Sequence, residues 1–327
     1  MARVVVVVCV AVLALFPQAG WPQAGWAQTF PTEPIHIIVP FPAGGNVDLT
    51  ARLVAPGISE TLGRPVVVEN RPGASGLIGA GEAIGAKPDG HTLLMGSNST
   101  LSVGPNVFAK WPHDPIKGIT PIINIQVVPF ALIVKADSAI KSVEDLVRRA
   151  KEKPGQITQA HTGTGSANHL VSELFQMLTG TKFDHVAYRG AAPAVNDLYA
   201  GQVHTFFDQA STTVPQVLGG TIKALAVTSA KRMPILPDTP TFKEVGVANF
   251  EVLNVTGLVG PAGMAPQVVA RLHAATLKAL ADPKVRDGFA RLGVEIVGST
   301  PAEFAAFIKD DLDRWARVVA EGRVNVK

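Results

Sequence analysis

The sequence predicts an α/β protein built from two domains. Short apolar runs of strand length alternate with stretches of helical apolar spacing, which is the pattern of α/β folds. The chain has 327 residues, more than one ordinary compact domain needs, and 47% of them are hydrophobic against 17% charged. This composition supports two buried cores and argues against disorder outside the chain ends.

An export signal is predicted over residues 1–27. Arg3 supplies a positive start, and residues 4–16 form an apolar run that is shorter than the about 20 residues needed to span a bilayer. Gly25 and Ala27 are small residues at the positions a signal peptidase reads, so we expect cleavage after Ala27 and a periplasmic protein. An uncleaved membrane anchor is the alternative.

The charge and cysteine content exclude several classes of function. The only cysteine, Cys9, lies in the export signal, so the mature chain is expected to have no disulfide, no thiolate catalysis and no cysteine-ligated metal. The formal net charge is +3, and the chain has no run of lysines or arginines. We therefore expect no nucleic-acid partner.

The first predicted unit alternates strands with helices. The helix over residues 48–62 contains Pro56, which is expected to kink it. A glycine-rich helix entry covers residues 73–85. The strands of this unit are predicted at residues 35–39, 65–69 and 91–95.

A second unit is expected to begin near Val128. Ser142, with Asp145 three residues later, predicts an N-cap for a helix over residues 143–153. The helix over residues 191–200 is expected to end on Gly201. The remaining elements of this unit are strands at 130–134, 183–187, 203–207 and 223–228, and a strand, loop and helix within 157–178.

From Phe250 onward the pattern of the first unit returns. An apolar strand is predicted at residues 255–259 and a helix at residues 266–280. Thr300, followed by Pro301 and Glu303, is a strong helix start, because it combines an N-cap, a proline at the first helical position and a capping-box partner.

Two glycine-containing loops between a strand and a helix are the candidate binding segments. The first carries Phe41, Ala43, Gly44 and Gly45, with Asp48 in the first turn of the helix that follows. Glycines let the backbone approach a ligand, and a helix N-terminus presents free N–H groups, so such a loop favours an anion without a basic side chain. An ordinary tight turn is the alternative interpretation.

The second loop repeats this design with added hydroxyl groups. It has no lysine after its glycines, unlike a phosphate-binding P-loop, and Asn168 stands where a dinucleotide fingerprint would have its third glycine. Two such loops in two units predict a ligand held in a cleft between them. The candidate residues of this loop are His161, Thr162, Gly163, Thr164, Gly165 and Ser166.

The sequence lacks the patterns of an enzyme or a metal site. It has no G-x-S-x-G or H-E-x-x-H segment, and no two histidines stand four residues apart on a helix. His169 is interpreted as a cap or packing residue. Asp48 and Asp208 could form a carboxylate pair, but a first-turn Asp and a strand-end Asp facing the cleft is the preferred interpretation. We predict no catalysis, no metal and no cofactor.

The ordered segments of the mature chain resemble the Bug family, the periplasmic solute-binding receptors of tripartite tricarboxylate transporters. Asp48, Arg52 and Arg232 stand at matching positions around these segments. The segments are IVPFPAGG (38–45), PVVVENRPGA (65–74), PDGHTLL (88–94), YRGAAPA (188–194), AGQV (200–203), ALAVT (224–228) and LPDTPT (236–241).

The resemblance implies the type II fold of periplasmic binding proteins, with two α/β domains around a cleft and two crossing strands as the hinge. The expected domains are residues 28–127 with 252–327, and residues 128–251. Its members bind tricarboxylates, dicarboxylates, acidic amino acids or aromatic carboxylates and deliver them to integral membrane subunits, and we expect a monomer.

The resemblance also assigns roles to residues of both loops. Backbone N–H groups of Ala43, Gly44 and Gly45 would grip the carboxylate, and Thr162 to Ser166 would supply further donors. Ala191 and Asp208 would line the second domain's side. No arginine clamp is evident.

Two departures from the family pattern put the ligand's identity in doubt. His161 stands where a small residue is frequent, and Asn168 where a histidine is frequent. A receptor for a sensor kinase and a hydrolase on a similar fold remain alternative functions.

Overall fold

Residues 30–322 are described by a computed structural model, and the predicted export signal lies outside them. The strands of these residues join into a ten-stranded sheet in the order β2-β1-β3-β9-β4-β7-β5-β6, with β8 and β10 also paired to β4. The strands are β1 (Ile35–Val39), β2 (Val66–Asn70), β3 (Thr92–Ser97), β4 (Ile119–Lys135), β5 (Thr158–His161), β6 (Asp184–Ala187), β7 (Thr205–Gln209), β8 (Ile222–Val227), β9 (Leu253–Pro261) and β10 (Glu295–Ile296).

Helices cover both faces of this sheet. Short single-turn segments, η1 (Ala74–Gly76) and η2 (Ser99–Val103), precede α2 and α3. The helices are α1 (Asn46–Leu62), α2 (Leu77–Ile84), α3 (Gly104–Val107), α4 (Val143–Glu152), α5 (Ala167–Thr179), α6 (Ala191–Ala200), α7 (Ala210–Leu218), α8 (Pro266–Ala281), α9 (Pro283–Arg291) and α10 (Pro301–Gly322).

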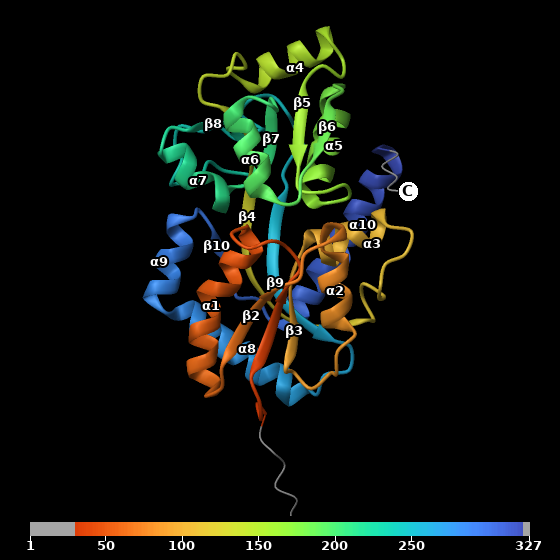
Figure 1. Cartoon of the computed structure of the whole chain (residues 1–327), viewed down its shortest axis with the longest axis vertical. Coiled ribbons are helices and arrows are strands. Elements are labelled where there is room, and N and C mark those ends of the chain that lie inside the picture. The colour runs from red at the N-terminus through yellow and green to blue at the C-terminus, as the bar shows by residue number, and fades with distance from the viewer. Residues whose placement is uncertain (1–29, 323–327) are drawn as a thin grey trace, which may run out of the picture.

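The elements form two lobes, which we call the first and second domains (Figure 1). The first domain contains β1, β2 and β3 in parallel pairs, with α1, α2, α8 and α9 around them. The second contains β5 and its parallel neighbours β6 and β7, with α4 to α7. Because parallel strands end at the same edge, the loops after β1 and β5 can meet between the lobes.

Two stretches of chain cross between the domains, and strand β4 is the longer. β4 pairs with β9 up to Pro129 and with β7 and β8 from Phe130 and Ala131 onward. The return crossing joins β8 to β9, and Val252 N–H donates to the carbonyl of Thr228 there. A pair of crossing segments is the geometry of a hinge.

Most predicted elements are present within a few residues of their expected bounds. α6 has the predicted bounds, and Ser142 caps α4 by accepting a hydrogen bond from Asp145 N–H. Helix α1 continues through Pro56. The sequence missed η2, α3, α7, α9 and β10, which are short or lack a clear apolar period. The strand predicted over residues 130–134 begins much earlier, since β4 starts at Ile119.

The C-terminal helix α10 links the two domains. Phe304 and Ile308, near its start, pack with Ile38 and Leu94 of the first domain. Further along, Trp315 lies in the core of the second domain, where Phe207 is also fully buried.

A buried carboxylate fixes α10 beside η2. Asp311 accepts hydrogen bonds from Asn98 Nδ2 at 2.8 Å, from Trp315 Nε1 at 3.1 Å and from the hydroxyl of Ser102. Burial raises the pKa of Asp311. This network holds η2 in place, and η2 borders the space between the domains.

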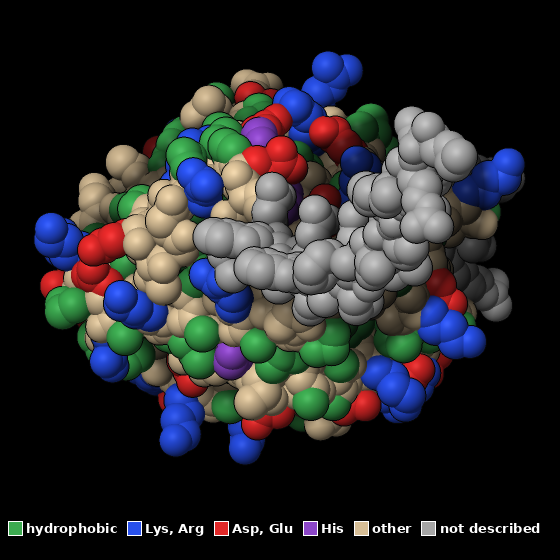
Figure 2. Space-filling view, turned by 90° about the horizontal axis from the view of Figure 1, so that it is seen from below, with side chains coloured by type: hydrophobic (Ala, Val, Ile, Leu, Met, Phe, Trp, Pro, Cys, Tyr) green, Lys and Arg blue, Asp and Glu red, His purple; other side chains and the backbone are tan. Residues whose placement is uncertain are grey.

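The surface is mixed in charge. On the face shown in Figure 2, positive side chains alternate with negative and apolar ones. Within residues 30–322, no helix is both long enough and apolar enough to cross a membrane.

Candidate functional site

A cavity of about 80 Å³ lies between the two domains, beside a groove of about 680 Å³. Cavity and groove share Phe41, Pro42, Thr162, Arg189 and Gly190 as lining residues. The cavity has room for a few water molecules or a small polar group, and the groove for the rest of a small molecule. The other residues lining the cavity are Ala43, Gly44, Gly45, Asn46, Val47, Ser97, Ser99, Asn168, Ala191, Ala192, Pro193 and Gln209.

The first wall is the loop between β1 and α1. Gly45 is the N-cap of α1 in an extended conformation (φ −81°, ψ 169°), and no side chain caps this end. The first hydrogen bond of the helix runs from Leu49 N–H to the carbonyl of Gly45. The amides of Asn46 and Val47 therefore have no partner within the helix, and both residues line the cavity.

Asp48 holds this loop in shape. Its carboxylate, 2% exposed, accepts hydrogen bonds from Gly44 N–H at 2.9 Å, Arg52 Nε at 3.0 Å and Asn70 Nδ2 at 2.9 Å. Burial opposes ionisation, but the bonds from Arg52, Gly44 and Asn70 outweigh it and lower the pKa of Asp48. The amide of Gly44 is thus occupied by Asp48, although the sequence interpretation gave it to the ligand.

The second wall is the loop between β5 and α5, and imidazole rings hold it. Gly163 N–H donates to His161 Nδ1 at 3.2 Å, and Gly165 N–H donates to His169 Nδ1 at 3.1 Å. Ser166 is fully buried and caps α5 by accepting a hydrogen bond from His169 N–H. Its hydroxyl therefore supports the loop and does not face the cavity.

Helix N-termini surround the cavity. Besides α1, helix α6 begins at Ala191 after Gly190, Asn168 lies in the first turn of α5, and Gln209 is the N-cap of α7. All of them line the cavity. Because a helix N-terminus carries partial positive charge, four of them bordering one space favour an anion there.

Arg189 adds a full positive charge. It lines both the cavity and the groove, and it is the only charged residue among the described residues that line either space. The sequence interpretation found no arginine clamp, because Arg189 precedes a helix by two residues and its position in the cleft depends on the fold of the second domain.

Direct contacts close the cleft over the cavity. Ser75 Oγ of the first domain donates to the carbonyl of Thr164 at 2.8 Å, and Ala167 N–H donates to Ser99 Oγ at 3.0 Å. A third bond runs from Ser211 Oγ to Asn46 Oδ1 at 2.7 Å. The two domains are therefore in a closed arrangement.

The predicted site residues fall into two groups. Asp48, His161, Gly165 and Ser166 do not line the cavity or the groove but hold the loops that do. The predicted residues that line one or both spaces are Phe41, Ala43, Gly44, Gly45, Thr162, Gly163, Thr164 and Ala191.

Asp208 is not brought to the cavity. Its side chain is fully buried, Oδ2 accepts a hydrogen bond from Thr212 Oγ1 at 2.6 Å, and burial raises the pKa of Asp208 to about 6. The predicted strand over residues 203–207 lies two residues too early, since β7 covers Thr205–Gln209. Side chains alternate between the faces of a strand, and Gln209 lines the cavity in place of Asp208.

The sequence analysis also missed polar residues that line the cavity. Asn46, Ser97 and Ser99 come from the first domain, and Gln209 from the second. Asn46 was detectable as the residue directly after the glycine pair, whereas Ser97 and Ser99 reach the cavity only because β3 ends beside β1.

Two groups of side chains in residues 30–322 are arranged so that they could hold a metal ion. Glu33, Asp89 and His91 form an exposed group near the start of β3. The second group, His161, His169 and His185, lies behind the second loop.

The fold and the site define a class of protein. Two α/β domains joined by crossing strands and closed over a small, electropositive cavity are a two-domain solute-binding protein. The model of the tripartite tricarboxylate transporter family receptor matches residues 50–323. The chain belongs to this family of solute-binding receptors.

Relatives and solved structures agree with this assignment. The protein BugT of Bordetella pertussis is 34% identical over 319 residues, which cover 97% of this chain and 98% of BugT. The periplasmic binding protein BugD has a similar structure, with a TM-score of 0.86, 34% identity, and coverage of 91% of this chain and 100% of BugD. MatC from Rhodopseudomonas palustris with bound malate gives a TM-score of 0.85 and 32% identity, covering 89% of this chain and 100% of MatC.

Proposed function

We propose that this protein is a periplasmic receptor that captures a small carboxylate between its two domains and delivers it to a tripartite tricarboxylate transporter. One observation carries the proposal, namely that four helix N-termini and Arg189 surround a single closed cavity. Such a site compensates negative charge with preorganised dipoles.

The size and charge of the site favour a dicarboxylate. The cavity accommodates one carboxylate beside the amides of Asn46 and Val47, while the adjoining groove accommodates a short chain. Arg189 borders both spaces and can pair with a second carboxylate. The malate bound to the similar protein MatC is a dicarboxylate, which supports this choice.

We also propose that the protein has no catalytic activity of its own. The described residues that line the cavity include no carboxylate, histidine, lysine or cysteine that could act as a general base or nucleophile. Export with cleavage after Ala27, action as a monomer, and recognition of the closed form by membrane subunits complete the proposal.

A thermal-shift experiment on residues 28–327 tests the ligand class. The protein is refolded to remove any carried-over ligand and screened against mono-, di- and tricarboxylates with their matched amides. A ligand at a hundred times its dissociation constant adds about 2.7 kcal/mol of stability, which raises Tm by a few degrees. We expect shifts with dicarboxylates and none with the amides. Shifts with amides or sugars alone would contradict carboxylate recognition.

Arg189→Gln tests which end of the ligand this residue meets. Loss of the charge is expected to weaken the binding of dicarboxylates about tenfold more than the binding of monocarboxylates of equal chain length. Arg64→Gln is the control, because Arg64 does not line the cavity or the groove and its side chain donates a hydrogen bond to the carbonyl of Pro31. Equal weakening of both ligand classes would place Arg189 at the carboxylate that all ligands share.

A further inference from the structure

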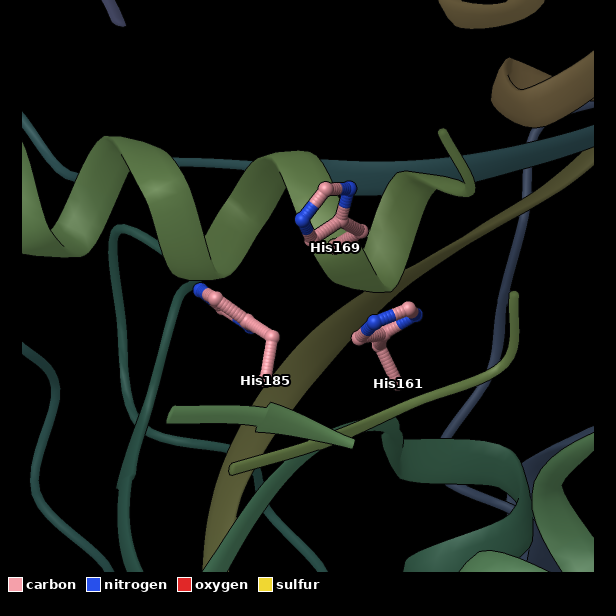
Figure 3. A group of neighbouring side chains, drawn as sticks. All are labelled: His161, His169 and His185. Carbon is pink, nitrogen blue, oxygen red and sulfur yellow. The ribbon is translucent and has the colours of Figure 1, made fainter. Parts of the chain in front are cut away.

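Three histidines from three elements of the second domain meet directly behind the ligand loop. His161 ends β5, His169 lies in the first turn of α5, and His185 is the second residue of β6. One ring nitrogen of each lies within 4.8 Å of those of the other two. Figure 3 shows His161 and His185 rising from the chain below the helix that carries His169.

A carboxylate completes the group. Glu173 stands one turn after His169 on α5, and its Oε1 lies 3.5 Å from His169 Nε2 and 3.0 Å from His185 Nε2. The side chains of His169, His185 and Glu173 are 9%, 18% and 20% exposed, and His161 is 2% exposed. Four potential ligands thus surround a point that is almost shielded from solvent.

The protonation states of this group suit a cation. Burial, followed by the neighbouring His169 and His185, lowers the pKa of His161 to about 3, so its ring is neutral at pH 7. Burial opposes ionisation of Glu173, but contacts with His169 and His185 outweigh it and lower the pKa of Glu173 to about 2. A neutral imidazole and an ionised carboxylate are the forms in which these two groups ligate metals.

The hydrogen bonds of His185 leave the arrangement incomplete. Gln176 is oriented by its Oε1, which accepts Phe183 N–H at 2.7 Å, so its Nε2 donor faces His185 Nε2 at 3.0 Å. The same ring nitrogen also faces the carboxylate of Glu173, an acceptor, while His185 Nδ1 is buried without a partner. No single tautomer satisfies both neighbours, so hydrogen bonding alone does not account for this arrangement.

We propose that His161, His169, His185 and Glu173 form a binding site for a divalent transition-metal ion of the Zn²⁺ type. Imidazole nitrogen with one carboxylate suits Zn²⁺, Co²⁺ or Ni²⁺, whereas Ca²⁺ and Mg²⁺ take oxygen ligands. Zn–N bonds of about 2.0–2.1 Å place ligand nitrogens roughly 3.3 Å apart in a tetrahedron. The rings must therefore approach one another on binding, which rotation about their χ angles allows.

Metal binding can affect the ligand loop through the Nδ1 atoms of His161 and His169, which accept hydrogen bonds from that loop. When His161 and His169 coordinate through Nε2, their Nδ1 atoms carry the proton and can no longer accept from Gly163 and Gly165. The released Gly163 amide lines the groove, and the ion adds positive charge behind it. Zn²⁺ should therefore change carboxylate affinity, a consequence that rests on the proposed function, whereas the metal site does not.

A titration of the full-length protein, without an affinity tag and after removal of metals by a chelator, tests the site itself. The probes are Zn²⁺ followed by calorimetry and Co²⁺ followed by visible absorption, because tetrahedral Co²⁺ has intense bands. The experiment is made in a His91→Gln background, so that the exposed group with Glu33 and Asp89 does not contribute. We expect one ion per chain and a tetrahedral Co²⁺ spectrum. Absence of both would overturn the proposal.

Variants locate the ion. His161→Gln and His185→Gln should each weaken Zn²⁺ binding at least about a hundredfold, since loss of a direct ligand exceeds the 10- to 100-fold effect of supporting residues. His204→Gln, exposed and in the same domain, should bind as the parent does. Tm in chelator verifies folding, and the half-buried His185 keeps the test valid if His161→Gln does not fold. Unchanged Zn²⁺ affinity in folded His185→Gln would also overturn the proposal.

Discussion

The two loops that face each other across the cavity have the same plan but are held by different chemistry. The loop over residues 40–46 is fixed by the carboxylate of Asp48, whose lowered pKa keeps it ionised in mild acid. The loop over residues 162–166 is fixed by neutral rings of His161 and His169 that accept backbone amides. Mild acid can protonate an imidazole while the Asp48 carboxylate stays ionised. We therefore expect the second wall, and not the first, to respond to protons or to metals that bind imidazole.

The largest expected effect comes from adding a side chain at Gly163 in the second loop. Its φ is +128°, and a Cβ there would lie 2.8 Å from Ser75 Oγ of the first domain. Gly163→Val should lower carboxylate affinity at least about a thousandfold, or about 4 kcal/mol, because strain and the clash both oppose closure. Calorimetry measures the affinity, and circular dichroism verifies the fold.

Gly44→Val is the matched variant in the first loop. Gly44 also has a positive φ of +83°, but a Cβ there meets nothing within 4 Å. Backbone strain alone costs about 1–3 kcal/mol, so binding should weaken far less than in Gly163→Val. Equal losses in the two variants would show that close approach across the cleft is not the cause.

Removal of the carboxylate tests what holds the first wall. Asp48→Ala should lower the free energy of unfolding by about 3 kcal/mol, because it leaves Gly44 N–H and Asn70 Nδ2 without their acceptor. Urea denaturation measures this change. Asp313→Ala is the control, since the exposed Asp313 has the same spacing from Lys309 as Asp48 from Arg52. A loss no larger than that of the control would mean that Asp48 does not hold the loop.

The contrast between the walls also shows what local sequence can predict. Both loops were found because a strand, a glycine pair and a helix start are contiguous in the chain, and each pattern has a local physical cause. Phe41, Gly45 and Thr162 line the cavity for this reason. The family resemblance added the expectation that Ala191 lines the second domain's side of the cleft.

The remaining site residues depend on contacts that no local pattern encodes. His161, His169 and His185 converge because β5 and β6 are parallel neighbours under α5, and a search for histidines four residues apart on a helix cannot detect that. Arg189 reaches the cavity through the packing of β6 and α6. For Asp208, the prediction ended the strand at residue 207 and placed this carboxylate at its exposed end, whereas β7 continues through Gln209 and buries the Asp208 side chain.

Acid should weaken the second wall and leave the first intact. His161 faces His169, His185 and Glu173, and its pKa is about 3 in the folded protein against about 6.5 when unfolded. The unfolded state therefore binds more protons below pH 6.5, so His161's contribution is full above that pH and is lost as pH falls toward 3. At pH 5 the loss is about 2 kcal/mol.

Urea denaturation at pH 7 and pH 5 measures this dependence. His161→Gln should remove most of the decrease, because an amide can accept from Gly163 without titrating in this range. His204→Gln, exposed and remote from the loop, should keep the full decrease. If His161→Gln loses as much stability as the parent between these pH values, other groups control the acid response.

The smallest effect expected concerns the bond that joins the two walls. Ser75 Oγ donates to the carbonyl of Thr164 at 2.8 Å, across the cleft and at its exposed edge. Ser75→Ala should weaken carboxylate binding about fivefold, or about 1 kcal/mol, through faster release from the closed form. Ser59→Ala is the control, because Ser59 Oγ donates to the carbonyl of Arg64 at 2.9 Å entirely within the first domain. If the two variants release ligand at the same rate, closure does not depend on this contact, and the cost of Gly163→Val must come from the backbone of the second loop.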